Sequence, residues 1–162
     1  MANRQFITFY LGDDLFGLDI LLVREINRNM DITKVDRAPD CVRGLMNLRG
    51  QIVTVLDLGV RLNIGARPIG RESSCVVLKT KAELGRSSHA GLDAHSAEDL
   101  TGLLVDRIGD VVSVEEDHIE PPPAHAGGIK GLFIEGVVKL QQQLLIALDV
   151  REVLRTQGES TP

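Results

Sequence analysis

The chain has 162 residues, enough for one domain with a sizeable core, and 43% of them are hydrophobic. A formal net charge of −5 argues against nucleic acid as the main partner, because phosphate binding needs clustered Lys and Arg. No apolar run approaches the roughly 20 residues that a membrane helix needs, and residues 1–6 show no signal-peptide hydrophobic region. We therefore expect a cytoplasmic globular protein. Aromatic residues make up only 3%, so its core must consist of Val, Leu and Ile.

Two strands joined by a turn are predicted at the start of the chain. Residues 6–11 are rich in aromatic and β-branched side chains, and residues 15–20 read as the returning strand after a turn at 12–14. Residues 21–26 are ambiguous, because their apolar positions fit either one helical turn or an irregular strand. Residues 27–36 are polar with single apolar residues in alternation, which indicates a short strand.

Residues 44–58, Gly-Leu-Met-Asn-Leu-Arg-Gly-Gln-Ile-Val-Thr-Val-Leu-Asp-Leu, are the most informative stretch. Residues 47–50 predict a tight turn, because Asn and Gly tolerate the positive φ that such turns often need. Residues 51–56 predict a strand that is buried on both sides, since its apolar groups point to both faces. Asp57 ends this strand as a turn residue or helix cap, and Arg49 is displayed at its beginning.

An internal repeat links the two halves of the sequence. Residues 136–150 repeat the pattern of residues 44–58, and residues 102–111 repeat that of residues 17–26. Each match keeps a glycine and an acidic residue in place, and the intervening positions mostly stay apolar. Two matches in the same order indicate a duplicated architecture.

Short strands at close spacing and little helix predict an all-β fold of small closed barrels, not an open parallel sheet. The duplication predicts two such barrels packed about a pseudo-two-fold axis within a single domain, residues 1–162. The two halves cover roughly residues 1–66 and 72–155. Asp149 and Glu152 resemble a capping box, which predicts a short C-terminal helix.

The second half carries an insertion at residues 82–99, between two strands that a short turn joins in the first half. The segment is rich in Gly, Ser, Ala, His and acidic residues. We expect a mobile hairpin insertion with too little apolar content to anchor it.

No pattern of catalytic or metal-binding residues stands out. The four histidines lack the spacing of a zinc site and are interpreted as solvated loop residues. Phosphate-loop, nucleophile-elbow and metalloprotease motifs are absent. Cys41 and Cys75 sit in apolar surroundings and are interpreted as buried free thiols. The sequence therefore nominates no enzymatic activity, no metal and no cofactor.

One alternative makes Asp57 the phosphoacceptor of a response-regulator receiver domain, because Asp13, Asp14 and Asp57 have about the required spacing. Receivers, however, place amphipathic helices between their strands, and residues 57–101 predict no long helix. The repeat also gives Asp57 a counterpart, Asp149, which predicts a helix cap. We therefore favour a capping or turn role for Asp57 and expect no phosphorylation there.

Residues 44–58 resemble the CheW-like chemotaxis coupling family, whose pattern runs roughly Gly-Val-x-Asn-Leu-Arg-Gly-x-Val-Val-Pro-Val-Val-Asp-Leu. The likeness extends along nearly the whole chain, including residues 10–12, 16–20, 23–26 and 102–106. The resemblance implies two five-stranded SH3-like barrels around a shared hydrophobic core, which agrees with the repeat.

The resemblance also implies a non-enzymatic adaptor that couples the cytoplasmic tip of a chemoreceptor, a helical hairpin, to the regulatory domain of the histidine kinase CheA. Such an adaptor is cytoplasmic and is recruited to membrane receptor arrays. Carried over position by position, the receptor-binding residues are Arg49, Val23, Glu25 and Gly44. Without the resemblance, Arg49 would be interpreted as a solvated turn residue, Val23 as a core residue and Gly44 as a backbone requirement.

The chain departs from the family pattern in two places. Thr54 stands where the family usually has proline, and we expect little effect because Thr suits a strand. The insertion at 82–99 is longer than usual and can reshape a partner surface. It leaves open whether the chain pairs with the kinase, and whether it serves flagellar chemotaxis or another output.

Overall fold

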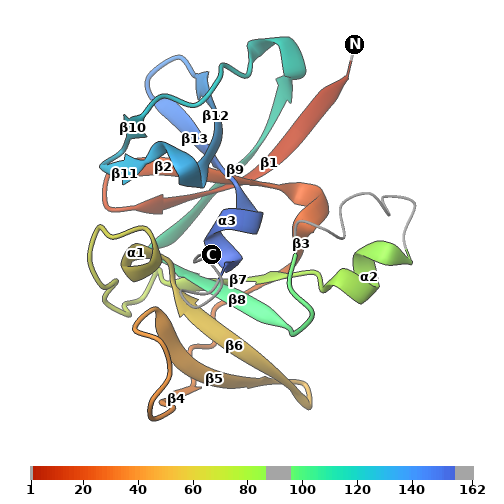
Figure 1. The fold of residues 1–162 in the computed structure, drawn as a ribbon, viewed down its shortest axis with the longest axis vertical. Coiled ribbons are helices and arrows are strands. Elements are labelled where there is room, and N and C mark those ends of the chain that lie inside the picture. The colour runs from red at the N-terminus through yellow and green to blue at the C-terminus, as the bar shows by residue number, and fades with distance from the viewer. Residues whose placement is uncertain (1, 87–95, 156–162) are drawn as a thin grey trace, which may run out of the picture.

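The structure, a computed structural model, describes residues 2–86 and 96–155. About half of these residues lie in short strands, and the α-helices are only four or five residues long. The strands form two large sheets, one in the upper and one in the lower half of Figure 1, and a small two-stranded ribbon. The all-β class that the sequence predicted is therefore confirmed.

The first sheet combines strands from both ends of the chain. Its strands are β1 (Asn3–Leu11), β2 (Asp14–Asp19), β9 (Arg107–Glu115), β12 (Ile134–Lys139) and β13 (Leu144–Leu148). They are hydrogen-bonded in the order β12-β13-β2-β1-β9. Neighbouring strands are antiparallel except for β13 and β2, which run parallel.

The second sheet also takes strands from both halves of the sequence. Its strands are β3 (Val23–Asn27), β4 (Ile32–Thr33), β5 (Val42–Leu48), β6 (Gln51–Asp57), β7 (Ser74–Leu78) and β8 (Thr101–Val105). Their order is β3-β7-β8-β6-β5-β4, and the parallel pair here is β6 with β8.

The remaining elements are short. The helices are α1 (Leu58–Arg61), α2 (Lys81–Gly85) and α3 (Val150–Leu154), and the ribbon is β10 (His125–Ala126) with β11 (Ile129–Lys130). Single 3-10 turns are η1 (Ile20–Leu22), η3 (Glu116–His118) and η4 (Gly131–Phe133). No helix in the described ranges is long and apolar enough to span a membrane.

The two sheets have the same strand order under the internal repeat. By the two sequence matches, β12, β13, β2 and β9 correspond to β5, β6, β8 and β3, and β1 takes the place of β7. The order of the first sheet then becomes β5-β6-β8-β7-β3, which is the second sheet without its edge strand β4. The parallel pair also occurs at the equivalent place in each sheet. This arrangement is the pair of SH3-like barrels about a pseudo-two-fold axis that the sequence predicted.

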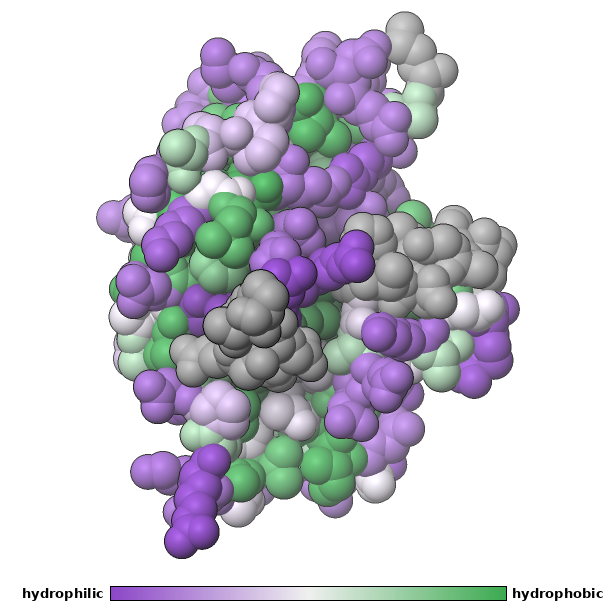
Figure 2. Space-filling model, in the orientation of Figure 1, coloured by the Kyte–Doolittle hydropathy of each residue, from purple (hydrophilic) through white to green (hydrophobic). Residues whose placement is uncertain are grey.

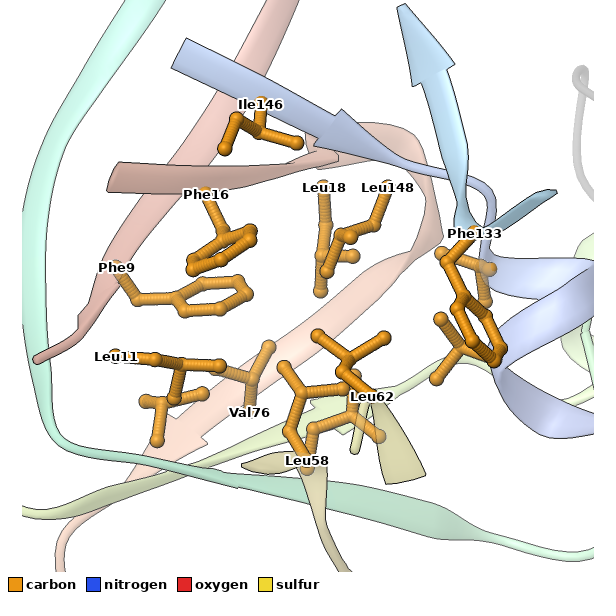
Figure 3. Close-up of a cluster of buried hydrophobic side chains, with 14 of the residues drawn as sticks. Phe9, Leu11, Phe16, Leu18, Leu58, Leu62, Val76, Phe133, Ile146 and Leu148 are labelled. Carbon is orange, nitrogen blue, oxygen red and sulfur yellow. The ribbon is translucent and has the colours of Figure 1, made fainter. Parts of the chain in front are cut away.

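A single hydrophobic cluster joins the two barrels (Figure 3). Phe9, Phe16 and Leu18 come from the first sheet. They pack against Val76 on β7 of the second sheet and against Leu58, directly after β6. All five are fully buried, and the two phenylalanine rings stack with centroids 6.1 Å apart. Each such side chain contributes about 1.5–3 kcal/mol when it leaves water, so this shared core is the main force that joins the barrels.

The ambiguous stretch at 21–26 contains both of the expected structures in succession. The turn η1 is capped by Asp19, whose side chain accepts a hydrogen bond from the Leu21 amide at 2.9 Å, and β3 follows it. The predicted short strand is β4, and the predicted C-terminal helix is α3. The Asp149 carboxylate caps α3 by accepting from the Glu152 amide at 3.3 Å, as the sequence indicated.

Two expectations about burial are wrong. Strand β6 is not buried on both sides at its start, because Ile52 is 56% exposed while Val53 and Val55 are fully buried. The first residues of β6 form the end of a hairpin that extends beyond the core, so one face meets solvent. Similarly, Cys75 is buried but Cys41 is only partly buried, and both are free thiols.

The insertion is anchored at both ends, contrary to expectation. Thr80 and Glu83 form a capping box that starts α2, and Leu84 on this helix is fully buried in the shared core. At the other end, the Lys81 amide donates to the Ala97 carbonyl at 2.8 Å. One buried leucine is enough to anchor the start of the segment. The rest of the expectation concerns mainly residues 87–95, which lie outside the described residues.

Candidate functional site

The β5–β6 hairpin closes in a two-residue turn, Arg49-Gly50, so that Leu48 pairs with Gln51. Both turn residues have positive φ, 51° for Arg49 and 86° for Gly50, as in the primed turns that match the twist of a hairpin. The Asn47 side chain supports the turn by accepting from the Gly50 amide at 2.9 Å. The predicted tight turn is confirmed. The sequence pointed to Asn and Gly as the residues with positive φ, whereas in the structure these are Arg49 and Gly50.

This backbone conformation is costly for arginine. A non-glycine residue in the left-handed region loses roughly 1–2 kcal/mol, because its Cβ crowds the following carbonyl oxygen. Asn, Asp or Gly would normally stand here. A long cation kept at a strained position directs attention to its side chain, since strain of this kind is concentrated at functional sites.

The Arg49 side chain is oriented by an ion pair with Glu25 on β3. Its Nη2 atom lies 2.5 Å from each of the two Glu25 carboxylate oxygens. The Arg49 side chain is 67% exposed and that of Glu25 26% exposed. A pair this exposed contributes only about 0–1 kcal/mol to stability. Its main effect is therefore to hold the guanidinium in one direction while most of it still faces solvent.

The structure places the other two predicted site residues differently. Val23 begins β3, pairs with Leu78, and packs its partly buried side chain against the shared core. Gly44 is buried and lies on β5, five residues before Arg49 in the turn. About 17 Å therefore separates the two along an extended strand. The structure thus joins Arg49 to Glu25 and puts Val23 on the same strand as Glu25, but sets Gly44 apart.

Gly44 is required by the backbone, whatever else it does. Its φ is +152°, and a Cβ built on it would lie 2.2 Å from the Thr33 carbonyl oxygen. The β5–β6 register also shifts between Val42 and Gly44. A side chain here would push β4 away from β5, so an effect of Gly44 on binding would act through the hairpin that carries Arg49.

Exposed apolar side chains flank the ion pair along the chain. Ile26 follows Glu25 and is 38% exposed, and Ile52 follows Arg49 by three residues and is 56% exposed. On the face shown in Figure 2, hydrophobic side chains gather over the region where Figure 1 places β5 and β6. Sequence reasoning missed Ile52, because a strand with apolar groups on both faces does not reveal which of them the rest of the fold covers.

Asp57 is a structural cap. The residue is only 1% exposed. Its carboxylate accepts hydrogen bonds from the Val60 amide at 3.3 Å, the Arg67 amide at 3.0 Å and Arg43 Nη1 at 2.9 Å. The predicted capping role is confirmed. The double-barrel fold and these three donors exclude the receiver alternative, because a phosphoacceptor must be reachable. Within residues 2–86 and 96–155, no group of three or more His, Cys, Asp or Glu is arranged to hold a metal ion.

Comparison with known proteins shows which family the chain resembles. The chain matches a family described as CheW-like domain over residues 5–158. A chemotaxis protein CheW from Treponema pallidum is 32% identical over 150 residues, covering 92% of this chain and 81% of that protein. A chemotaxis protein CheW from Klebsiella aerogenes is 27% identical over 156 residues, covering 96% of this chain and 84% of that protein.

A solved structure agrees in fold as well as in sequence. The crystal structure of the scaffolding protein TtCheW from Thermoanaerobacter tengcongensis has a TM-score of 0.79 and 28% identity to this chain. The alignment covers 98% of this chain and 92% of that one.

The two SH3-like barrels, with the family match and the solved scaffolding protein of the same fold, define a protein of the scaffold class. The chain belongs to the CheW-like domain family, as its Asn-Leu-Arg-Gly turn and repeat indicated. It is accordingly a scaffold protein of chemotaxis signalling.

Proposed function

We propose that this chain is a non-enzymatic adaptor that binds the cytoplasmic tip of a chemoreceptor and couples it to the histidine kinase CheA. The observation that carries the proposal is the Arg49 turn. An exposed guanidinium stands at a strained backbone position and is held in one direction by Glu25. Such a side chain is arranged for contact with a partner.

The chemistry of the turn suits a helical partner. Docking of a helix needs an apolar surface with a few polar anchors at its edge, and Ile52, three residues after Arg49, is an exposed apolar group on the same hairpin. Arginine suits an anchor, because its planar fork binds carboxylates or backbone carbonyls and also stacks on flat groups. Glu25 engages Nη2, so the rest of the fork is available to a receptor tip.

The family resemblance supports the kinase as the second partner. The regulatory domain of the kinase is expected to have the same fold, so the two proteins would associate barrel to barrel. Val111 and Leu144 give the first sheet exposed apolar side chains, at 52% and 38%, that such a contact can cover. The adaptor would then work in the cytoplasm, at receptor arrays on the membrane.

Reconstitution from purified parts tests the adaptor role. A soluble receptor-tip fragment and the kinase regulatory domain are mixed with the chain and separated by size-exclusion chromatography. We expect all three to elute together, and we expect Arg49→Ala to release the receptor fragment while the kinase domain stays bound. Arg71→Ala, at an exposed arginine in a loop, is the matched control and should leave the complex whole. If neither partner elutes with the wild-type chain, the adaptor proposal is wrong.

A further inference from the structure

The loop between the two repeats is fastened to the fold along its length. Residues 63–73 contain no helix or strand, yet the Ile64 amide donates to the Gly59 carbonyl at 2.9 Å. The contact is so close that a Cβ on Gly59 would lie 2.1 Å from the Gly65 carbonyl oxygen. The loop therefore lies directly against α1, in a place that only a glycine on the helix permits.

Arg67, in the middle of this loop, binds two carboxylates at once. Its guanidinium makes a two-pronged pair with Asp106, from Nε to Oδ1 at 3.0 Å and from Nη2 to Oδ2 at 2.7 Å. Its backbone amide donates to Asp57 Oδ2 at 3.0 Å, and its carbonyl accepts from Arg43 Nη1 at 2.8 Å. Because Arg43 also binds Asp57, these four residues form one connected network.

The network reaches both barrels. Asp57 ends β6 in the second sheet, whereas Asp106 stands where the chain leaves β8 of the second sheet and enters β9 of the first. Asp106 also accepts from the Gly12 amide, in the β1–β2 turn of the first sheet, at 2.6 Å. The Asp106 amide in turn donates to the Tyr10 carbonyl on β1 at 3.1 Å. Arg67 thus ties the end of a strand in one barrel to a hairpin turn in the other.

The tie adds directional bonds to the contact between the barrels. Burial of apolar surface is non-directional, so the shared core sets the angle only through the fit of its packed side chains. A two-pronged arginine–carboxylate pair has fixed geometry and loses its energy when its partners rotate. Its side chains are only 16% and 23% exposed, which limits screening by water.

The tie is also one-sided. Under the repeat, Asp57 corresponds to Asp149, and Asp106 corresponds to Leu21. Among the salt bridges of the described residues, Asp57 takes part in one and Asp149 in none. We propose that Arg67 is a positioning residue that fixes the angle between the two barrels, through its simultaneous bonds to Asp57 and Asp106. The inference concerns the isolated chain and does not rest on the proposed adaptor role.

Distances between spin labels on the two barrels test the inference directly. Labels are attached at Ile52→Cys on β6 and Val111→Cys on β9, two exposed strand positions in different sheets. Cys41 is first replaced by serine. Cys75 can stay, because it is fully buried and burial raises its pKa to about 12, so it does not react with the label.

We expect the wild-type chain to give one narrow distance distribution. Arg67→Met should broaden that distribution and move its maximum by more than the width of the wild-type peak, while circular dichroism still shows the native strands. Arg67→Lys keeps the charge but not the fork, and should fall between the two. Asp106→Asn breaks the same pair from the other side, and it serves if the Arg67 variants do not fold.

The matched control is an ion pair inside one barrel. Arg4 on β1 binds Asp19 on β2 at 2.9 Å and also Glu135 on β12, all in the first sheet. Arg4→Met should leave the distance between the labels unchanged. An unchanged, narrow distribution in a folded Arg67→Met or Asp106→Asn variant would overturn the inference, as would equal broadening in Arg4→Met.

Discussion

The β5–β6 hairpin of the second barrel and the β12–β13 hairpin of the first are equivalent in the repeat, and both bend at a glycine. The register shifts just before Gly44 in one and just before Gly136 in the other. A Cβ on Gly136 would lie 2.8 Å from the Glu120 carbonyl oxygen, where one on Gly44 would meet that of Thr33. Each hairpin also ends at an aspartate that caps a short helix.

The hairpin tips differ. Arg49-Gly50 in the second barrel corresponds to Gln141-Gln142 in the first, and Glu25 corresponds to Asp110. The first barrel therefore carries neither the arginine nor a charge pair at this place, and Gln141 is not among the residues with positive φ. The residues that shape the backbone have been kept in both copies, whereas the side chains that face solvent have diverged. This difference supports the proposal that the Arg49 turn is the receptor-binding end of the molecule.

The largest effect is expected at the paired glycines. Gly44→Ala should lower the free energy of unfolding by about 4 kcal/mol, because it combines a backbone clash with positive φ. Gly136→Ala should cost about 2 kcal/mol, since its contacts are longer and its φ is ordinary. Urea unfolding of both variants measures the difference. Equal losses would mean that φ adds nothing to the clash.

The paired aspartates should differ next. Asp57→Ala should cost about 3 kcal/mol, because it leaves Arg43 and a buried amide without their partner. Asp149→Ala should cost about 1 kcal/mol, the usual loss of a helix cap. Thermal unfolding of the two variants, side by side, checks the ranking. A larger loss for Asp149→Ala would contradict the network assigned to Asp57.

Acid should weaken the second barrel's tie to the first. Burial raises the pKa of Asp106, but hydrogen bonds from Arg67 and the Gly12 amide and the charges of Arg67 and Arg107 outweigh it, so the pKa is lowered from 3.8. A depressed pKa contributes stability that is present above pH 3.8 and is lost as the pH falls through the folded-state value. Unfolding free energies between pH 7 and pH 2.5 should therefore fall less steeply for Asp106→Asn than for the wild-type chain. Parallel curves would contradict this.

The smallest predicted effect has opposite signs at the two hairpin tips. Arg49→Gly should raise the unfolding free energy by about 1 kcal/mol, because glycine removes the positive-φ strain. Gln141→Gly should lower it by about 0.5 kcal/mol, since glycine there only adds freedom to the unfolded chain. Denaturant midpoints of the two variants measure the signs. A loss of stability in Arg49→Gly would mean that the ion pair with Glu25 outweighs the strain.

The repeat carried enough information to predict the double barrel, because glycines, caps and strand periods are local features of the sequence. Asp149 could be recognised as a cap for the same reason. The exposure of Ile52 could not be predicted, since it depends on which strands cover which face. Nor could the burial of Leu84, which lies in a segment of otherwise polar composition.

The site was only partly visible in the sequence. Arg49 and Glu25 stand far apart along the chain, and the resemblance nominated both without showing that they touch. The network of Asp57, Arg67 and Asp106 left no local pattern, because its partners come from a strand end, a loop and a crossover. Long-range ion pairs of this kind depend on the assembled fold, and a single sequence does not display them.

One measurement tests the central claim that the Arg49 turn is the receptor-binding end. Affinity for a receptor-tip fragment is measured by titration calorimetry for Arg49→Ala and for Gln141→Ala, its equivalent in the other barrel, with melting temperature recorded beside it. We expect Arg49→Ala to cost on the order of 2 kcal/mol, roughly thirtyfold in affinity, while the fold stays intact. Gln141→Ala should bind as the wild-type chain does. Unchanged affinity in a folded Arg49→Ala variant, or an equal loss in both, would contradict the account.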